Sequence, residues 1–255
     1  MERKKTKVNN AFYDTLNDTW SGRDDHPIAL LLAENRVRTP WIADQVQKEF
    51  DRPCNILDIG CGGGHLSNHL ATMGHQLSGI DLSEPSLSFA KSQDTTHSVA
   101  YEKADACHLP FEENQFDVVC AMDLLEHVDH PKIVIEEASR VLKPGGLFFF
   151  HTFNRTILSY LLIIKAVEWF IPNTPKNLHV FSHFITPKEM KNWCQNACLH
   201  VNVLQGFIPD SRKKSFWRTA LTRTVSEEFS FRFSSSLSTG YVGIAKKTSQ
   251  MHNML

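Results

Sequence analysis

Short apolar segments alternate with longer amphipathic segments through the middle of the chain. The apolar segments have the length of buried strands, and the segments between them carry apolar residues at helical spacing. This alternation predicts a doubly wound α/β fold, in which helices cover both faces of a mainly parallel sheet. The expected strands are 56–59, 76–80, 99–103, 116–121, 147–152, 200–206 and 241–246, and the expected helices are 66–73, 84–92, 131–142 and 187–196.

Before the first strand the pattern is helical rather than alternating. We expect residues 1–50 to form a helical cap, with Pro27 and Pro40 each beginning a helix. Residues 51–247 are then expected to form one α/β domain.

Two segments of that domain stand out by composition. Residues 157–171 are apolar apart from Lys165 and Glu168, and they predict a helix. Residues 207–238 are first basic and then rich in serine and phenylalanine, and we expect an irregular excursion there.

Length and charge exclude several classes of protein. A chain of 255 residues supports one large core, and its formal net charge of -1 gives no overall attraction for nucleic acid. The six cysteines form no C-x-x-C pair, so we expect reduced thiols and a cytoplasmic location. Residues 1–10 are polar and basic, unlike a secretory signal, and no run of 18 apolar residues predicts a membrane span.

A glycine-rich turn follows the first expected strand. Gly60, Gly62 and Gly64 alternate, Asp58 precedes them, and Asp81 ends the next strand. An acid at the end of the second strand suits the ribose hydroxyls of a nucleoside ligand. Dinucleotide enzymes place pyrophosphate at the glycine turn, but the Asp58 carboxylate would repel that group and would attract an ammonium and a sulfonium. The turn therefore favours S-adenosylmethionine over a dinucleotide.

With these residues the chain resembles the class I S-adenosylmethionine methyltransferases. The resemblance implies a Rossmann-like single domain with a seven-stranded sheet whose last strand is antiparallel. It also implies that Asp105 is the acid that meets the adenine. Met122 is expected to lie over the adenine, where a thioether suits an aromatic edge, and ordinary core packing is the alternative. The implied cofactor-binding residues are Arg38, Asp58, Gly60, Cys61, Gly62, Asp81, Leu82, Asp105, Ala106 and Met122.

The chain is most similar to the ubiquinone-biosynthesis O-methyltransferase family, which methylates polyprenylated catechols. The segments 35–42, 120–128, 152–155 and 179–189 carry this resemblance. It implies that Arg38 helps to hold the cofactor and that the acceptor is a lipid-like quinol or phenol. The chain departs from the family in segment 207–238, and it has Asp123 where the family usually has glutamate. Methylation of another small metabolite, a non-catalytic cofactor-binding scaffold and a nucleotide-dependent oxidoreductase remain alternatives, although Asp58 argues against the last.

Three ionisable residues follow the fourth expected strand: Asp123, Glu126 and His127. The spacing of Asp123 and Glu126 would place them on one face of a helix, where with His127 they suit a Mg²⁺ or Zn²⁺ ion. Metal dependence is also what the family resemblance implies. The alternatives are that His127 is a metal-free base, with Glu126 beside it, or that both are structural. His151 is a weaker candidate base.

The apolar segment 157–171 would be too short to span a bilayer as a helix. An interfacial helix or substrate lid is one interpretation, with Tyr160 and Trp169 at the membrane surface and Arg155, Lys165 and Lys176 at the lipid headgroups. Packing on the protein's own core is the other. The basic and aromatic residues 212–218 favour a solvated loop over a second membrane contact or an RNA contact. The sequence leaves the oligomeric state open.

Overall fold

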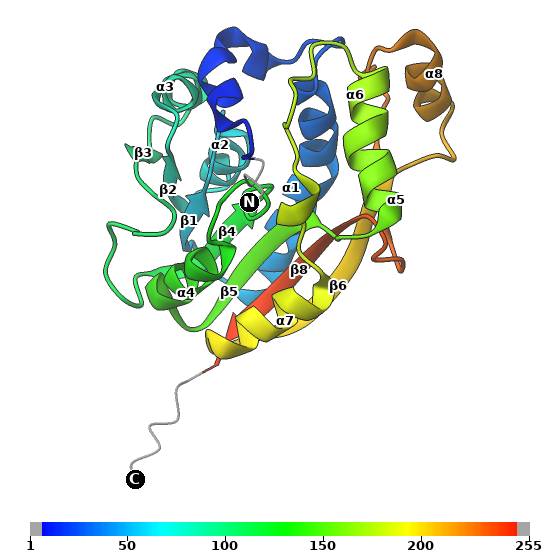
Figure 1. Cartoon of the computed structure of the whole chain (residues 1–255). Coiled ribbons are helices and arrows are strands. Elements are labelled where there is room, and N and C mark those ends of the chain that lie inside the picture. The colour runs from blue at the N-terminus through cyan, green and yellow to red at the C-terminus, as the bar shows by residue number, and fades with distance from the viewer. Residues whose placement is uncertain (1–6, 249–255) are drawn as a thin grey trace, which may run out of the picture.

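One eight-stranded sheet organises the chain, in the order β3-β2-β1-β4-β5-β8-β6-β7 (Figure 1). The computed structural model describes residues 7–248. The strands are β1 (Asn55–Ile59), β2 (Gln76–Asp81), β3 (Ala100–Lys103), β4 (Phe116–Met122), β5 (Leu142–Phe153), β6 (Leu199–Pro209), β7 (Phe231–Ser234) and β8 (Gly240–Lys247). Strands β1 to β5 pair in parallel, whereas β8, β6 and β7 are added in antiparallel pairs.

Helices cover both faces of this sheet, as the sequence predicted. They are α1 (Ile28–Glu49), α2 (His65–Thr72), α3 (Glu84–Gln93), α4 (Pro131–Val141), α5 (Ile157–Ser159), α6 (Ala166–Phe170), α7 (Pro187–Asn196) and α8 (Lys214–Thr222). Short 3-10 helices occupy Asn10–Thr15 (η1), Asn17–Ser21 (η2) and Phe181–His183 (η4), and a π-helix occupies Tyr160–Lys165 (η3).

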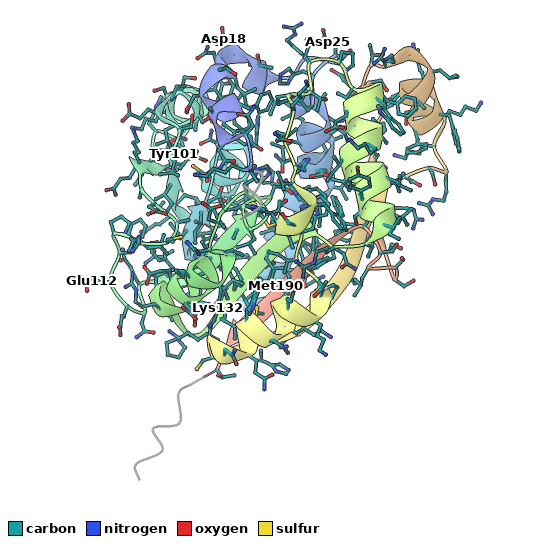
Figure 2. All side chains as sticks on the ribbon, viewed as in Figure 1. Asp18, Asp25, Tyr101, Glu112, Lys132 and Met190 are labelled. Atoms are coloured by element: carbon teal, nitrogen blue, oxygen red, sulfur yellow. The ribbon has the colours of Figure 1, made fainter. Side chains whose placement is uncertain are left out.

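Alternation along the central strands creates two cores. Leu57 and Val119 belong to a cluster with residues of α4 and α7, whereas Ile56 and Val118 belong to a cluster with residues of α1 and α2. Met190 of α7 points into the first cluster, while Lys132 and Glu112 lie on the outer surface (Figure 2). Because β1, β2, β4 and β5 run parallel to one another, their carboxyl ends meet at the same edge of the sheet.

The sheet has one strand more than the seven that the sequence predicted, and this additional strand is β7. This strand and α8 lie in segment 207–238, which we expected to be irregular. Phe231 and Phe233 alternate along β7, and the ring of Phe231 stacks on Phe207 of β6 at 5.3 Å between centroids. Apolar packing therefore orders a segment whose composition is typical of loops.

Pro40 does not begin a helix, contrary to the prediction, but lies inside α1. Proline costs that helix one backbone hydrogen bond. Both halves of α1 are nevertheless held by packing, since Ala29 and Ala33 lie in one buried cluster and Ile42 and Val46 lie in another. Ahead of α1, the chain forms the short helices η1 and η2 rather than a long one.

The predicted apolar helix is formed by α5, η3 and α6 in direct succession. It stands beside α1 and α8 in Figure 1. No helix within residues 7–248 combines the length and the apolar character that crossing a bilayer requires.

The capping box of α7 gives a test of local stability. The Thr186 side chain accepts a hydrogen bond from the backbone of Glu189, whose carboxylate in turn accepts one from the backbone of Thr186 at 2.8 Å. We expect Thr186→Ala to lower the free energy of unfolding by about 1 kcal/mol, because orphan N–H groups of the helix lose their acceptor. Urea denaturation measures this, and Thr72→Ala, at an exposed helix end, should change it by less than about 0.5 kcal/mol. Equal losses of stability in the two variants would contradict the role of Thr186 as the cap of α7.

Candidate active site

A cavity of about 840 Å³ opens at the carboxyl ends of β1, β2 and β4. Ligands of doubly wound sheets bind at this edge. The cavity is lined by every residue that the sequence predicted to hold the cofactor: Arg38, Asp58, Gly60, Cys61, Gly62, Asp81, Leu82, Asp105, Ala106 and Met122. The same cavity continues toward the apolar helix 157–170 and α8.

The glycine turn is shaped by left-handed backbone and by Asp81. Gly62 and Gly64 have φ of 50° and 75°, which other residues adopt at a cost, and Gly64 is the N-cap of α2. The Asp81 carboxylate accepts hydrogen bonds from the backbone N–H groups of Gly62 and Ser83, both at 2.9 Å. Each carboxylate oxygen keeps a free lone pair, which suits two ribose hydroxyls.

The chain closes the outer side of this turn with Trp20 of η2. A side chain at Gly63 would approach the indole within 2.7 Å, so the turn and the N-terminal segment fit closely. Leu82, although 62% exposed, faces the cavity beside Asp81 and offers an apolar surface to a planar base. Together these residues fit the adenosyl part of S-adenosylmethionine.

Asp58 is buried at the end of β1 and accepts a hydrogen bond from the Ser67 hydroxyl at 2.7 Å. Burial raises the pKa of Asp58 to about 7, although the bond from Ser67 opposes this rise. A positively charged group of the cofactor placed beside Asp58 would favour its ionised form.

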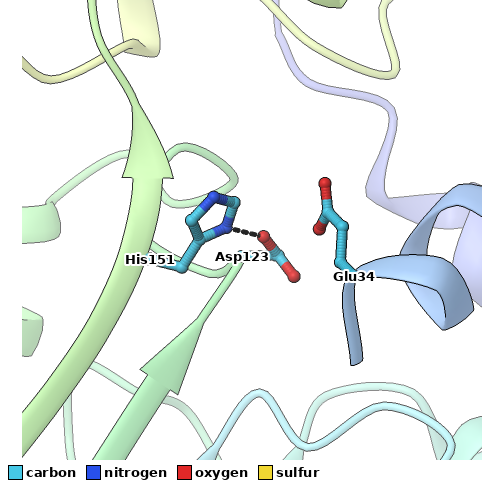
Figure 3. Close-up of side chains that lie close together, drawn as sticks. All are labelled: Glu34, Asp123 and His151. Carbon is cyan, nitrogen blue, oxygen red and sulfur yellow. Dashed lines mark hydrogen bonds and ion pairs between the residues drawn. The ribbon is translucent and has the colours of Figure 1, made fainter. Parts of the chain in front are cut away.

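Arg38 is the centre of a buried charge cluster, and Figure 3 shows the three side chains around it, Glu34, Asp123 and His151. Its guanidinium forms an ion pair with Asp123 and a second one with Glu34 at 3.1 Å, and it contacts Nδ1 of His151 at 3.0 Å. Asp123 also bonds to Nδ1 of His151. Burial opposes ionisation of Asp123, but Arg38 and His151 hold its pKa well below the usual range. Burial, with the charge of Asp123 adding to it, raises the pKa of Glu34 well above its usual range.

The predicted metal-binding trio is not assembled. Residues 123–130 form turns rather than a helix, and Asp123 has φ of 55°, so the helical spacing that would align Asp123 with Glu126 does not apply. In the part of the chain that the structure describes, the side chains that converge are Glu34, Asp123 and His151. That group already surrounds the Arg38 guanidinium, so the residues as placed do not fit a divalent ion.

Glu126 and His127 differ in their access to the cavity. Glu126 is buried behind the cavity wall, where it accepts a hydrogen bond from the Thr152 hydroxyl at 2.8 Å, and burial raises its pKa to about 8. His127 lines the cavity. Burial lowers its pKa to about 4, so the imidazole is neutral at pH 7 and one ring nitrogen can accept a hydrogen bond. Of the two predicted catalytic residues, only His127 can therefore meet an acceptor directly.

Sequence reasoning missed Tyr13 and gave no role to His179. The Tyr13 ring lies edge-on to His127 with centroids 5.7 Å apart, and the His179 ring lies 5.2 Å from His127. Both residues line the cavity. The concentration of aromatic residues at 12–20 was the available signal for Tyr13, and the matching segment 179–189 was the signal for His179.

Apolar side chains form the wall opposite the glycine turn. The helical segment α5, η3 and α6 supplies Leu158, Leu162, Ile163, Ala166, Val167 and Phe170, and α8 supplies Phe216 and Ala220. This wall suits a hydrophobic acceptor.

Comparisons with known proteins agree with this geometry. Residues 57–150 match the model of a methyltransferase domain. The ubiquinone biosynthesis O-methyltransferase of Actinobacillus pleuropneumoniae is 34% identical over 202 residues, which cover 75% of this chain and 82% of the relative. The enzyme of the same name from Coxiella burnetii is 32% identical and covers 86% and 91%. The chain belongs to the ubiquinone biosynthesis O-methyltransferase family.

The fold comparison points the same way. A SAM-dependent methyltransferase structure from Methanosarcina mazei superposes with a TM-score of 0.58 at 20% identity, covering 81% of this chain and 98% of the other. This likeness shows the Rossmann-like fold that the sequence predicted. The domain match and the relatives show that the chain is an S-adenosylmethionine-dependent methyltransferase.

The buried carboxylate of Asp58 predicts a pH-dependent cofactor affinity. If the ammonium of S-adenosylhomocysteine lies beside Asp58, binding requires its ionised form. A pKa of about 7 in the free protein then makes binding about tenfold tighter at pH 8 than at pH 6. Calorimetric titration measures this dependence.

Asp58→Asn should bind more weakly at pH 8 and lose this dependence, whereas Asp51→Asn, on an exposed loop, should keep it. A slope that survives in Asp58→Asn would contradict the role of Asp58.

Proposed function

We propose that the protein methylates a hydroxyl of a polyprenylated catechol or phenol of ubiquinone biosynthesis. The observation that carries this proposal is one continuous cavity, which joins the acidic glycine-turn end to an apolar wall. The names of the relatives supply the acceptor class. The apolar wall fits it, because a prenyl tail can lie along α5, η3 and α6 while the ring lies near His127.

Residues at different places along the cavity have different roles. Asp81 and the backbone of the glycine turn hold the nucleoside, and Asp58 and Arg38 lie where the methionine part ends. The bound cofactor supplies an activated methyl group. His127 accepts the proton of the acceptor hydroxyl, and the apolar wall excludes water and orients the ring.

A methyl-transfer assay with short-chain demethylated catechol analogues tests the activity. We expect transfer to a catechol oxygen, and we expect His127→Ala to lower kcat by roughly 100-fold, the usual loss when a general base is removed. His130→Gln is the matched control, because His130 is exposed and absent from the cavity wall.

Binding of S-adenosylhomocysteine without transfer to any catechol would overturn the proposal in favour of a scaffold or another acceptor. Running the assay with EDTA and with Mg²⁺ or Zn²⁺ tests the metal hypothesis separately. Turnover lost in EDTA and restored by an ion would require the Arg38 cluster or the 123–127 turn to rearrange.

We further propose that the mouth of the cavity docks on the membrane surface where such acceptors reside. Exposed apolar residues gather on the helices beside the mouth: Ile157, Leu161, Trp169, Trp217 and Leu221. Arg223 donates a hydrogen bond to the Trp169 carbonyl at 2.7 Å, which joins the end of α8 to α6. The exposed Lys213, Lys214 and Arg218 on and beside α8 add positive charge.

Two of the three cations that were predicted to meet lipid headgroups form ion pairs within the protein. Arg155 pairs with Glu189, and Lys165 pairs with Glu168 at 2.7 Å, so these two cations already have partners. We therefore propose that the basic residues of α8, rather than Arg155 and Lys165, meet the lipid headgroups.

Liposome flotation tests the docking surface. We expect the triple variant Trp169→Ser, Trp217→Ser, Leu221→Ser to bind anionic liposomes about tenfold or more weakly than the native protein, because it removes apolar area that would enter the interface. The control variant Met73→Ser, Ile133→Ser removes exposed apolar residues elsewhere and should float normally. Equal flotation of the native protein and the triple variant would exclude the surface.

A further inference from the structure

We propose that His127 and His179 act as a pair that binds the two neighbouring oxygens of a catechol and thereby selects the oxygen that is methylated. This inference rests on the proposed function and adds a specificity-determining residue, His179, to it. His127 takes the proton of the attacked hydroxyl, and His179 holds the hydroxyl beside it.

The two imidazoles reach the same point from different parts of the chain. His127 lies in the turn after β4, and His179 lies in the loop between α6 and η4. Their ring centroids are 5.2 Å apart with planes tilted by 57°, and both line the cavity. A catechol presents two hydroxyls on adjacent ring carbons, so each imidazole can meet one of them.

Packing fixes both rings without using their nitrogens. Tyr13 lies edge-on to His127, and Phe153 lies edge-on to His179 with centroids 5.1 Å apart. Neither imidazole makes a hydrogen bond within the described residues, and Nδ1 of His127 is fully buried. An imidazole whose polar atoms lack partners at a cavity wall is available to a polar ligand.

The N-terminal segment fixes the positions of the two loops relative to each other. Asn10 donates a side-chain hydrogen bond to the His127 carbonyl at 2.9 Å, and the backbone N–H of Asn9 donates to the Asn177 carbonyl at 2.9 Å. The spacing of the pair is thus set by a third segment, which also carries Tyr13.

Methyl transfer makes one bond at the acceptor oxygen, breaks one bond at sulfur and moves one proton. The attacked oxygen forms a bond to the methyl carbon, and the carbon–sulfur bond breaks with its electron pair remaining on sulfur. The proton of that oxygen passes to Nε2 of His127, since the other ring nitrogen is sealed in the protein. His179 hydrogen-bonds the neighbouring hydroxyl, which keeps its proton and stays unmethylated.

The test uses a short-chain catechol with two inequivalent hydroxyls and measures the ratio of its two monomethyl ethers. We expect the native protein to favour one ether strongly. His179→Ala should lower that ratio about five- to tenfold, the effect of losing one hydrogen bond of ordinary strength. His179→Gln, which keeps a donor and an acceptor, should restore part of the preference, and His130→Gln should not alter it.

A binding measurement gives a second readout that does not depend on turnover. With S-adenosylhomocysteine present, calorimetry should show that the native protein prefers the catechol to the matching phenol with one hydroxyl. His179→Ala should lose this preference while it keeps native affinity for S-adenosylhomocysteine.

The proposed pair would be contradicted if His179→Ala lowered the yields of both ethers by the same factor. It would also be contradicted if the variant kept both the native ether ratio and the native preference for catechol over phenol. If the native protein itself methylates no catechol, the proposed function fails as well. The native control therefore separates the two outcomes.

Discussion

The burial of several carboxylates around one guanidinium is the constraint on which the active site depends. Glu34, Asp58 and Glu126 are buried near one sheet edge, and Asp123 lies among them. Among the residues that the structure describes, Arg38 is the buried arginine or lysine. Burial raises the pKa values of Glu34, Asp58 and Glu126, and the nearby Arg38 opposes this rise without cancelling it. Burial acts on Asp123 in the same direction, but its direct contacts with Arg38 and His151 outweigh burial and lower its pKa.

This imbalance explains why the site suits its cofactor. S-adenosylmethionine carries an ammonium and a sulfonium, and these charges would compensate carboxylates that the protein itself leaves without a cation. A ligand rich in negative charge, such as a pyrophosphate, would make the imbalance worse. We therefore propose that charge selects the cofactor at one end of the cavity and that the apolar surface at the other end selects the acceptor.

Local sequence predicted what depends on local structure. The glycine turn and its acids are set by backbone conformation and by strand ends, so the sequence could place Asp58, Gly62 and Asp81 at the ends of the first two strands, where they line the cavity. The same holds for the capping box at Thr186. The metal-binding trio failed to form because its alignment assumed a helix after β4. The chain instead turns there, and Asp123 is drawn toward Arg38, a residue 85 positions away in sequence.

Contacts between segments that are distant in the sequence could not be predicted from the sequence. His127 and His179 meet only because the loops after β4 and α6 are packed together, and Tyr13 joins them from η1. The strand β7 was missed although its alternating phenylalanines favour a strand, because the surrounding serines indicated a loop and the stacking partner, Phe207, lies in another strand. The most direct measurement of the central claim is parallel calorimetry of the whole chain with S-adenosylhomocysteine and with NADH. The account predicts binding of S-adenosylhomocysteine that Asp81→Ala abolishes, and no binding of NADH. Binding of NADH without S-adenosylhomocysteine would contradict it.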